Sequence, residues 1–374
     1  NQVIKFESTD AARTAVILGD HRISYGRFSA DVENLARWLV CQGVTPGQRI
    51  GIFLRNNYWC WVCHLAALRL GLILITLVPH FKMESETGGL LDVALGELED
   101  VDAPVVIARQ LIVFSPQDMA PFAEQVESYA AVRDYTDLRK EAGALRLFLT
   151  SGTTGKFKIV PLNMDMLRSR VALVGKSQAI NEDTRLLSLM GIDTIGGFTF
   201  PLATWNAGGC VLFIHPVPVN ENNLGGVPYD TCNLLLVAPA RLLTLLQKTP
   251  KPWKERVART IVVGGSRLSI RVRDEALRCA CSHISMIYGA TETGSIATGG
   301  SELLDRHPGA VGFAVDGARV QIVDRKGHPR PRGAIGIVRT RTPHMFRGYE
   351  GAAGSRPDNG LRGGWFYPGD EGVL

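Results

Sequence analysis

Residues 232–289 contain CNLLLVAP (232–239), RTIVVGG (259–265) and HISMIYG (283–289), three short runs rich in Val, Ile and Leu. Sequence of amphipathic, helical character separates them. Short apolar runs between helices are typical of buried parallel strands. The same alternation extends through the first three hundred residues, so the sequence predicts an α/β fold.

The character of the sequence changes near Gly309. From there to Tyr349, strand-like pieces are separated by Gly and Pro, and no helical period persists. We therefore expect a small, mainly β subdomain in residues 309–374, after an α/β region in residues 1–308. Residues 82–142 are acidic and interrupted by proline, and no chemistry can be placed there.

The composition indicates a large globular protein, since 45% of the 374 residues are hydrophobic and 21% are charged. The 41 basic and 36 acidic residues give a net charge of +5 that is spread along the chain, unlike the basic patch of a nucleic-acid binder. Seven cysteines, mostly in apolar stretches, predict reduced, buried thiols and a cytoplasmic location. The polar start of the sequence lacks the apolar core of a signal peptide, so no secretory signal is expected.

One stretch, WCWVCHLAALRLGLILITLV (59–78), is long and apolar enough to suggest a membrane span. His64, Arg69 and Gly71 interrupt it, and a charge near the centre of a span is costly. We therefore predict a buried helix, a turn at Gly71 and a buried strand. The stretch also contains CWVCH (60–64), the spacing of covalent haem attachment, for which inward packing of the same side chains is the favoured alternative.

A candidate phosphate-binding loop lies in LFLTSGTTGKFKIVP (147–161), where an apolar strand enters a loop of glycine and hydroxyl residues and then reaches Lys158. Glycines let backbone N–H groups converge on an anion, hydroxyls add donors, and a lysine supplies a point charge for phosphate oxygens. The loop is not of the Walker type, because GxxxxGK followed by Ser or Thr is absent. On composition alone, a flexible turn is the alternative.

This loop resembles TSGTTGxPKG, the signature of the adenylate-forming superfamily of acyl- and aryl-CoA ligases, luciferases and peptide-synthetase adenylation domains. The matching positions are Thr150, Ser151, Gly152, Thr153, Thr154, Gly155 and Lys158. Phe157 stands where the family usually has proline, and Ile159 stands where it usually has glycine.

IYGATETG (287–294) resembles the YGxTE motif of the same family. The resemblance implies that Tyr288 lines the adenine pocket, that Thr291 contacts phosphate or the substrate carboxylate, and that Glu292 binds Mg²⁺. A carboxylate beside a triphosphate suits a hard cation that prefers oxygen ligands. In isolation, the segment would also fit an ordinary turn.

GGWFYPGDEG (363–372) resembles the WxxTGD motif, with Pro368 in place of the usual threonine. The resemblance implies that Asp370 holds both ribose hydroxyls, and a carboxylate can accept two such hydrogen bonds. VVGGSRLS (262–269) looks like the glycine turn that the family places beside adenine and the acyl group.

The resemblance also implies which further residues surround the two ligands. The expected ATP site includes Gly265 and Gly289 in addition to the motif residues. The expected acyl pocket includes the residues Gly196, Gly197, Gly264 and Met286.

Asp193, in LMGIDTIGGF, aligns with the family position that faces the substrate, where acyl- and aryl-CoA ligases typically have histidine. Amino-acid-activating domains use an aspartate near this point to pair with the substrate's ammonium group, and a buried carboxylate without such a partner is costly. One hypothesis is that Asp193 meets an amino group or another donor on the substrate. The alternative is that Asp193 is the N-cap of the helix that begins at TIGGF.

The resemblance covers nearly the whole chain. It implies two packed α/β subdomains in residues 1–308, with mainly parallel sheets flanked by helices, that form the ATP and acid cleft. It also implies a small distorted β-barrel in residues 309–374, which ends at the ribose-binding motif. Three clusters of residues, around Lys158, Glu292 and Asp370, are expected to bind one ATP molecule.

The expected reaction is the activation of a carboxylic acid, which can be an aryl, acyl or amino acid, with ATP and Mg²⁺ to acyl-AMP, with release of pyrophosphate. Lys158, Thr291 and Glu292 would be the catalytic residues. The acyl group would then pass to the thiol of CoA or of a phosphopantetheine carrier protein. No nucleic-acid partner and no membrane span are expected.

In this family a small C-terminal domain with a catalytic lysine normally follows the ribose-binding aspartate, and the sequence in hand ends at Leu374, shortly after Asp370. We therefore expect slow adenylation by residues 1–374 alone. A nonenzymatic relative that only binds adenylates is the alternative function, because Phe157, Ile159 and Pro368 depart from the family pattern. A c-type haem protein is the remaining alternative.

Overall fold

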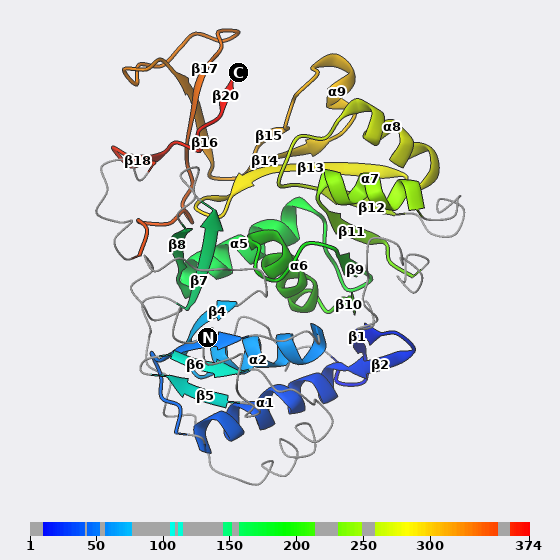
Figure 1. Cartoon of the computed structure of the whole chain (residues 1–374). Coiled ribbons are helices and arrows are strands. Elements are labelled where there is room, and N and C mark those ends of the chain that lie inside the picture. The colour runs from blue at the N-terminus through cyan, green and yellow to red at the C-terminus, as the bar shows by residue number, and fades with distance from the viewer. Residues whose placement is uncertain are drawn as a thin grey trace. The chain divides into compact units, whose positions relative to one another are not determined.

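A computed structural model describes residues 10–41, 43–52, 57–76, 105–108, 111–114, 145–151, 157–213, 231–248, 259–350 and 360–374. These residues form two compact units, and Figure 1 labels their helices and strands. The first unit contains the described residues up to Met164, with Phe213 and Glu350, and the second unit contains the others.

The first unit is built on a sheet in which six described strands are ordered β5-β6-β3-β4-β7-β8. The inner pairs β6–β3, β3–β4 and β4–β7 are parallel, and the outer pairs β5–β6 and β7–β8 are antiparallel. The bounds are β3 (Arg49–Ile52), β4 (Ile73–Thr76), β5 (Val105–Ala108), β6 (Leu111–Phe114), β7 (Arg146–Ser151) and β8 (Phe157–Leu162).

A hairpin of β1 (Thr14–Leu18) and β2 (His21–Ser24) leads into α1 (Tyr25–Cys41), which packs on α2 (Asn57–Arg69). α1 is amphipathic and buries one face of the helix. The Tyr58 hydroxyl of α2 donates a hydrogen bond to the Asp31 carboxylate of α1 at 2.5 Å. Nε of Arg27 donates to the same carboxylate at 3.0 Å, so this buried charge has two partners.

The predicted helix, turn and strand in residues 59–78 are confirmed where the structure describes them. α2 ends at Arg69, Gly71 turns with a φ of 69°, and β4 follows. Cys60, Cys63 and His64 are all buried, and Nδ1 of His64 lies 2.6 Å from the Cys60 carbonyl oxygen. The side chains of CWVCH therefore pack inside the unit. Within the described ranges, no helix has both the length and the apolar character that crossing a membrane requires.

The second unit contains a sheet ordered β15-β14-β13-β12-β11-β9-β10. Neighbouring strands from β10 to β13 are parallel, and β14 and β15 add antiparallel pairs. The three apolar runs in residues 232–289 form β11, β12 and β13, which confirms the predicted α/β class. The bounds are β9 (Arg185–Ser188), β10 (Cys210–Phe213), β11 (Leu234–Val237), β12 (Thr260–Val263), β13 (His283–Ala290), β14 (Gly294–Gly300) and β15 (Phe313–Ala314).

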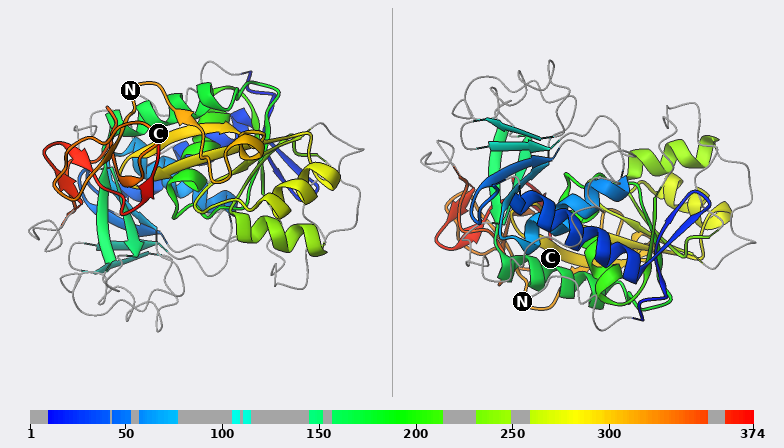
Figure 2. Two further views of the ribbon diagram at one scale, coloured as in Figure 1. Left: turned by 90° about the horizontal axis from the view of Figure 1, so that it is seen from above. Right: turned by 90° about the horizontal axis from the view of Figure 1, so that it is seen from below.

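Helices cover this sheet. α6 packs on β9 and β11, and α7 and α8 lie side by side, with α8 against β13 (Figure 2). Their bounds are α5 (Met164–Ser177), α6 (Ile195–Asn206), α7 (Pro239–Lys248), α8 (Ile270–Cys279) and the short α9 (Leu303–Arg306). Because these helices follow the strands in alternation, the carboxyl ends of the parallel strands meet at one edge of the sheet.

The described residues from Gly309 onward are mainly strands and turns, as predicted. They include an antiparallel sheet ordered β16-β17-β19-β18, in which β20 also pairs with β17. The expected distorted barrel is not seen: the described strands form an open sheet, because β18, β19 and β20 span two residues each and close no ring. The bounds are β16 (Arg319–Val323), β17 (Gly336–Arg341), β18 (Leu361–Arg362), β19 (Trp365–Phe366) and β20 (Glu371–Gly372). The subdomain boundary at residue 309 stays a prediction.

All seven cysteines lie in described positions, and none of them forms a disulfide. Six are buried, as predicted, and Cys41 is exposed at the end of α1. The prediction was wrong for Cys41, the last residue of α1, although Trp38 and Leu39 in the same turn are buried.

Candidate active site

Two of the recognised motifs meet in the second unit. The Tyr288 hydroxyl, on β13, donates a hydrogen bond to Oδ2 of Asp370 at 2.6 Å across 82 residues of sequence. Burial, followed by the Asp370 carboxylate, raises the pKa of Tyr288, so the phenol remains a donor at neutral pH. The structure therefore joins the residue predicted beside adenine to the residue predicted on the ribose.

Thr291 and Glu292 follow β13 directly, in the turn to β14. Oε1 of the nearly buried Glu292 carboxylate accepts a hydrogen bond from the Tyr349 hydroxyl at 2.7 Å. Burial and the Glu292 charge raise the pKa of Tyr349, which keeps that proton on the phenol. Among the described residues no hydrogen bond reaches Oε2 of Glu292.

Arg170 of α5 is buried behind this turn. Its guanidinium donates to the carbonyl oxygens of Thr291, Glu292 and His344, at distances from 2.8 to 3.1 Å. Burial lowers the pKa of Arg170 to about 9, with the Glu292 charge opposing the shift. The side chain is therefore still a cation at pH 7. Burial and this cation lower the pKa of His344 to about 4, so its imidazole is neutral.

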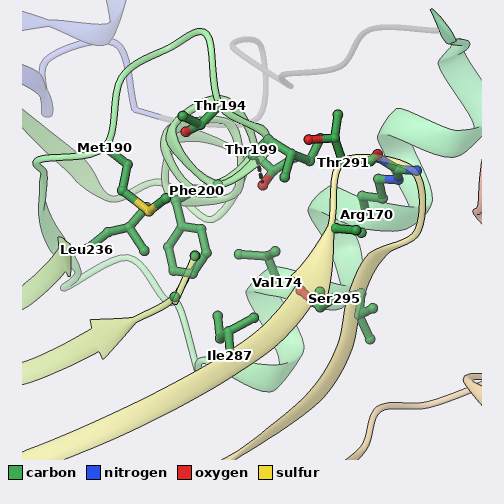
Figure 3. Close-up of a pocket in the computed structure, with 18 residues that line it drawn as sticks. Arg170, Val174, Met190, Thr194, Thr199, Phe200, Leu236, Ile287, Thr291 and Ser295 are labelled. Atoms are coloured by element: carbon green, nitrogen blue, oxygen red, sulfur yellow. Dashed lines mark hydrogen bonds between the residues drawn. The ribbon is translucent and has the colours of Figure 1, made fainter. Parts of the chain in front are cut away.

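A pocket of about 270 Å³ lies beside β13 (Figure 3). Met190, Phe200 and Leu236 gather on one side of it, and Arg170 and Thr291 lie on the other (Figure 3). The lining residues are Arg170, Leu173, Val174, Met190, Thr194, Ile195, Gly196, Thr199, Phe200, Leu236, Gly264, Gly265, Ile287, Gly289, Ala290, Thr291, Gly294 and Ser295. Within this described lining, Arg170 is the one charged residue, and most of the wall is apolar.

The structure brings several predicted residues to the pocket and leaves three of those predicted near the substrate out, namely Met286, Gly197 and Asp193. Gly196, Gly264, Gly265 and Gly289 line it, together with Thr291. The residues Met286 and Gly197, which the resemblance also placed there, do not. Successive residues of a strand point to opposite faces, so Ile287 faces the pocket instead of Met286.

Gly197 has a packing role. A Cβ at this position would lie 2.0 Å from the carbonyl oxygen of Gly191, so only glycine lets the first turn of α6 sit against the preceding loop. We expect Gly197→Ala to lower the free energy of unfolding by about 2 kcal/mol, because backbone cannot yield as a side chain does. Gly175→Ala is the matched control: it lies in α5 with nothing within 4 Å of a Cβ.

Alanine at Gly175 should instead stabilise the protein by about 0.5 kcal/mol, since it reduces the entropy of the unfolded chain. Chemical denaturation followed by tryptophan fluorescence measures both variants. Equal midpoints for the two would refute the packing role of Gly197.

Asp193 is not the N-cap of α6. That position is Thr194, whose Oγ1 accepts a hydrogen bond from the Gly197 amide at 3.0 Å, so the N-cap alternative was wrong by one residue. Asp193 does not line the pocket. Its carboxylate turns back over Gly191, with Oδ1 only 2.1 Å from where a Cβ on that glycine would lie. A role of Asp193 toward the substrate stays a prediction.

The predicted phosphate loop is flanked by β7 and β8, an antiparallel pair in which Thr150 lies opposite Lys158. The Thr150 hydroxyl donates a hydrogen bond to the Lys158 carbonyl oxygen at 3.4 Å. The loop residues Gly152, Thr153, Thr154 and Gly155 lie outside the described residues, and Ser151 is described by its backbone alone. Lys158 belongs to the first unit, and Glu292 and Asp370 belong to the second. The convergence of these three clusters on one ATP therefore stays a prediction.

None of the motifs marks Arg170, but the helical period does. In MDMLRSRVALVGKS, Met166, Arg170 and Val174 recur every fourth residue, and all three are buried on one face of α5. A charged residue on the apolar face of a helix is uncommon unless it has partners. That pattern is the signal by which sequence could have indicated Arg170.

Comparison with known proteins bears on this site. The sequence profile of the family described as AMP-binding enzyme matches residues 6–350. Nonribosomal peptide synthetase nlsA of Emericella nidulans is 28% identical over 351 residues, which are 90% of this chain and 6% of that protein. The fatty acid–[acyl-carrier-protein] ligase ScoC of Streptomyces coeruleorubidus is 25% identical over 406 residues, covering 100% of this chain and 74% of that protein.

A solved structure also has a similar fold. The crystal structure of apo MatB from Rhodopseudomonas palustris is similar with a TM-score of 0.76, at 22% identity, over 99% of this chain and 75% of that one. Because the family profile spans nearly all of its 374 residues, the chain belongs to the AMP-binding enzyme family.

Proposed function

We propose that the protein activates a carboxylic acid with ATP, giving acyl-AMP and pyrophosphate, and then passes the acyl group to a thiol. The observation that carries this proposal is the Tyr288–Asp370 hydrogen bond on the strand that also lines the apolar pocket. Membership of the AMP-binding enzyme family supports ATP as the nucleotide substrate. The name of ScoC supports a carrier-protein thiol as acceptor, with CoA as the other candidate.

The residues on and after β13 fit an adenosine and its phosphates. We propose that the Tyr288 ring lies against adenine and that the exposed Asp370 carboxylate accepts hydrogen bonds from both ribose hydroxyls. The hydrogen bond from Tyr288 holds that carboxylate in place before the nucleotide arrives. Lys158 is proposed to neutralise phosphate charge from the first unit.

Glu292 fits a magnesium ion. Proteins usually hold Mg²⁺ through one or two carboxylates together with substrate phosphates. Glu292 supplies one such carboxylate, fixed by Tyr349 through Oε1. When bound there, Mg²⁺ would offset the charge that accumulates on the phosphates during the reaction.

The pocket fits the acid. The Thr291 hydroxyl lines one side of it, which suits a carboxylate, and the opposite side is apolar. In the proposed step, a carboxylate oxygen of the acid attacks the α-phosphorus. The bond from that phosphorus to the bridging oxygen breaks, and pyrophosphate leaves with the electron pair. The protein contributes alignment and charge rather than covalent chemistry.

We expect the preferred acids to carry an apolar acyl or aryl group and no α-amino group, because the described lining offers no carboxylate to an ammonium. A screen of paired acids, each with and without the amino group, measures acid-dependent ATP–pyrophosphate exchange. Asp193→Ala should leave the order of preference unchanged. A selective loss of amino acids in that variant would instead show that Asp193 pairs with the substrate.

Nucleotide binding and chemistry are measured separately, so that a protein that binds ATP without activating an acid can be recognised. Titration calorimetry should detect ATP binding, and exchange should then depend on an acid. Binding without exchange, under every acid tested, would favour a nonenzymatic adenylate-binding protein. CoA and a phosphopantetheinylated carrier protein, offered in parallel, identify the thiol acceptor. We also propose a cytoplasmic location, because the seven cysteines form no disulfide.

A further inference from the structure

Arg170 makes an unusual set of contacts for a buried cation. The side chain is 2% exposed and donates four hydrogen bonds, all to backbone carbonyl oxygens. Nη1 reaches Thr291 at 2.8 Å, Nη2 reaches Glu292 and His344 at 3.0 Å each, and Nε reaches His344 at 3.1 Å. Two chain segments, one after β13 and one after β17, are therefore tied to a single guanidinium.

These carbonyls belong to the turn that carries the proposed magnesium ligand. The Glu292 carbonyl oxygen also accepts a hydrogen bond from the Phe346 amide at 2.7 Å, and the Thr293 carbonyl oxygen accepts one from the Thr342 hydroxyl at 3.0 Å. Three consecutive carbonyls, from Thr291 to Thr293, are thus fixed. A turn held in this way leaves the Glu292 side chain little freedom in direction.

The neighbouring backbone makes room for the guanidinium. Gly294 has a φ of 69°, in the left-handed region that favours glycine. A Cβ at this position would lie 3.2 Å from Nε and 3.3 Å from Cδ of Arg170, closer than ordinary contact. Close approach of the arginine and the turn thus depends on a residue without a side chain.

We infer that Arg170 is a positioning residue for the proposed adenylation, which fixes the turn at Thr291 and Glu292 so that the Glu292 carboxylate is held ready for the divalent cation. The inference rests on the proposed function. Arginine suits this task because its planar fork presents five N–H donors in a fixed geometry, whereas the lysine ammonium is a point donor. Lysine at this position would keep the positive charge and lose the planar arrangement of N–H donors.

The test compares Arg170 with Arg259, a buried arginine that has the same kind of partners. Arg259 is 1% exposed and donates to the carbonyl oxygens of Cys232 at 3.2 Å and Ala280 at 3.0 Å, which belong to no proposed ligand site. The variants are Arg170→Lys and Arg170→Gln, with Arg259→Lys and Arg259→Gln as matched controls. Circular dichroism and thermal unfolding give the folded fraction of each.

The first readout involves no turnover. Binding of Mn²⁺, as a stand-in for Mg²⁺, is followed by electron paramagnetic resonance with a nonhydrolysable ATP analogue and no acid. We expect both Arg170 variants to bind Mn²⁺ about 10- to 100-fold more weakly than the parent protein, as is typical when a group that orients a metal ligand is lost. At equal folded fraction, the Arg259 variants should stay within about twofold of the parent protein. The Mg²⁺ concentration required for pyrophosphate exchange should rise in the Arg170 variants and stay near the parent value in the Arg259 variants.

Several outcomes would overturn the inference. Parent-like Mn²⁺ binding in Arg170→Lys would show that charge suffices and the fork does not matter. Equal losses in the Arg170 and Arg259 variants would show a general packing effect. If Arg170→Gln does not fold, Arg170→Lys carries the comparison alone. Absence of Mn²⁺–nucleotide binding in the parent protein would refute the proposed function itself, and the inference with it.

Discussion

Replacement of Glu292 by glutamine is expected to reduce acid-dependent ATP–pyrophosphate exchange by about 100-fold or more, the usual effect of losing a charge that stabilises the transition state. The amide has nearly the same shape, and its oxygen can still accept the hydrogen bond from Tyr349, which spans 2.7 Å in the structure. The variant should therefore fold normally. What it loses is the negative charge that an Mg²⁺ ion requires of its ligand.

Two further measurements test whether the loss of exchange comes from weaker Mg²⁺ binding. Raising Mg²⁺ should partly restore exchange in Glu292→Gln, because mass action compensates for weaker binding. Tyr349→Phe keeps the carboxylate and removes its hydrogen bond, so its loss should be smaller, on the order of tenfold. Full exchange in Glu292→Gln at low Mg²⁺ would remove Glu292 from the proposed mechanism.

The second large effect is expected at Asp370. Changing Asp370 to alanine should weaken ATP binding by about 100-fold, since each of two hydrogen bonds to a charged group contributes roughly a factor of ten. Titration calorimetry with ATP measures the loss. The carboxylate is exposed, so the substitution should leave the free energy of unfolding nearly unchanged.

A modified nucleotide distinguishes loss of the ribose contact from other causes of weaker ATP binding. 2′,3′-Dideoxy-ATP lacks both hydroxyls, so the parent protein and Asp370→Ala should bind it with the same affinity. A 100-fold difference that persists with the dideoxy nucleotide would mean that Asp370 acts elsewhere, for example by orienting Tyr288 through their hydrogen bond.

The sequence predicted the sheet of the second unit well, for a physical reason. Strands buried on both faces need unbroken runs of Val, Ile and Leu, and β11 and β12 are such runs. The same reasoning could not tell which side of β13 faces the pocket. Met286 and Ile287 are both apolar, and only pairing with neighbouring strands decides which one faces the pocket.

Sequence patterns also could not predict polar contacts between residues that are far apart in the sequence. The family's motifs implied that Tyr288 and Asp370 bind the same nucleotide, but the hydrogen bond between them was not predicted, because nothing local in either segment indicates its partner. Arg170 showed the opposite case: its helical period marked it as buried, but its carbonyl partners lie 121 to 174 residues away. At α6, Asp193 and Thr194 are both good N-caps, and only the backbone geometry selects Thr194.

Strand β13 has a consequence for how this enzyme family can diversify. Strand β13 carries Ile287 and Gly289, which line the pocket proposed for the acid, and also Tyr288, which is proposed to lie against adenine, so one strand links the two proposed binding sites. The far wall of the acid pocket comes from other elements, through Met190, Phe200 and Leu236. Under the proposed function, substitutions in that wall would change which acid is accepted and leave the backbone of β13 unchanged.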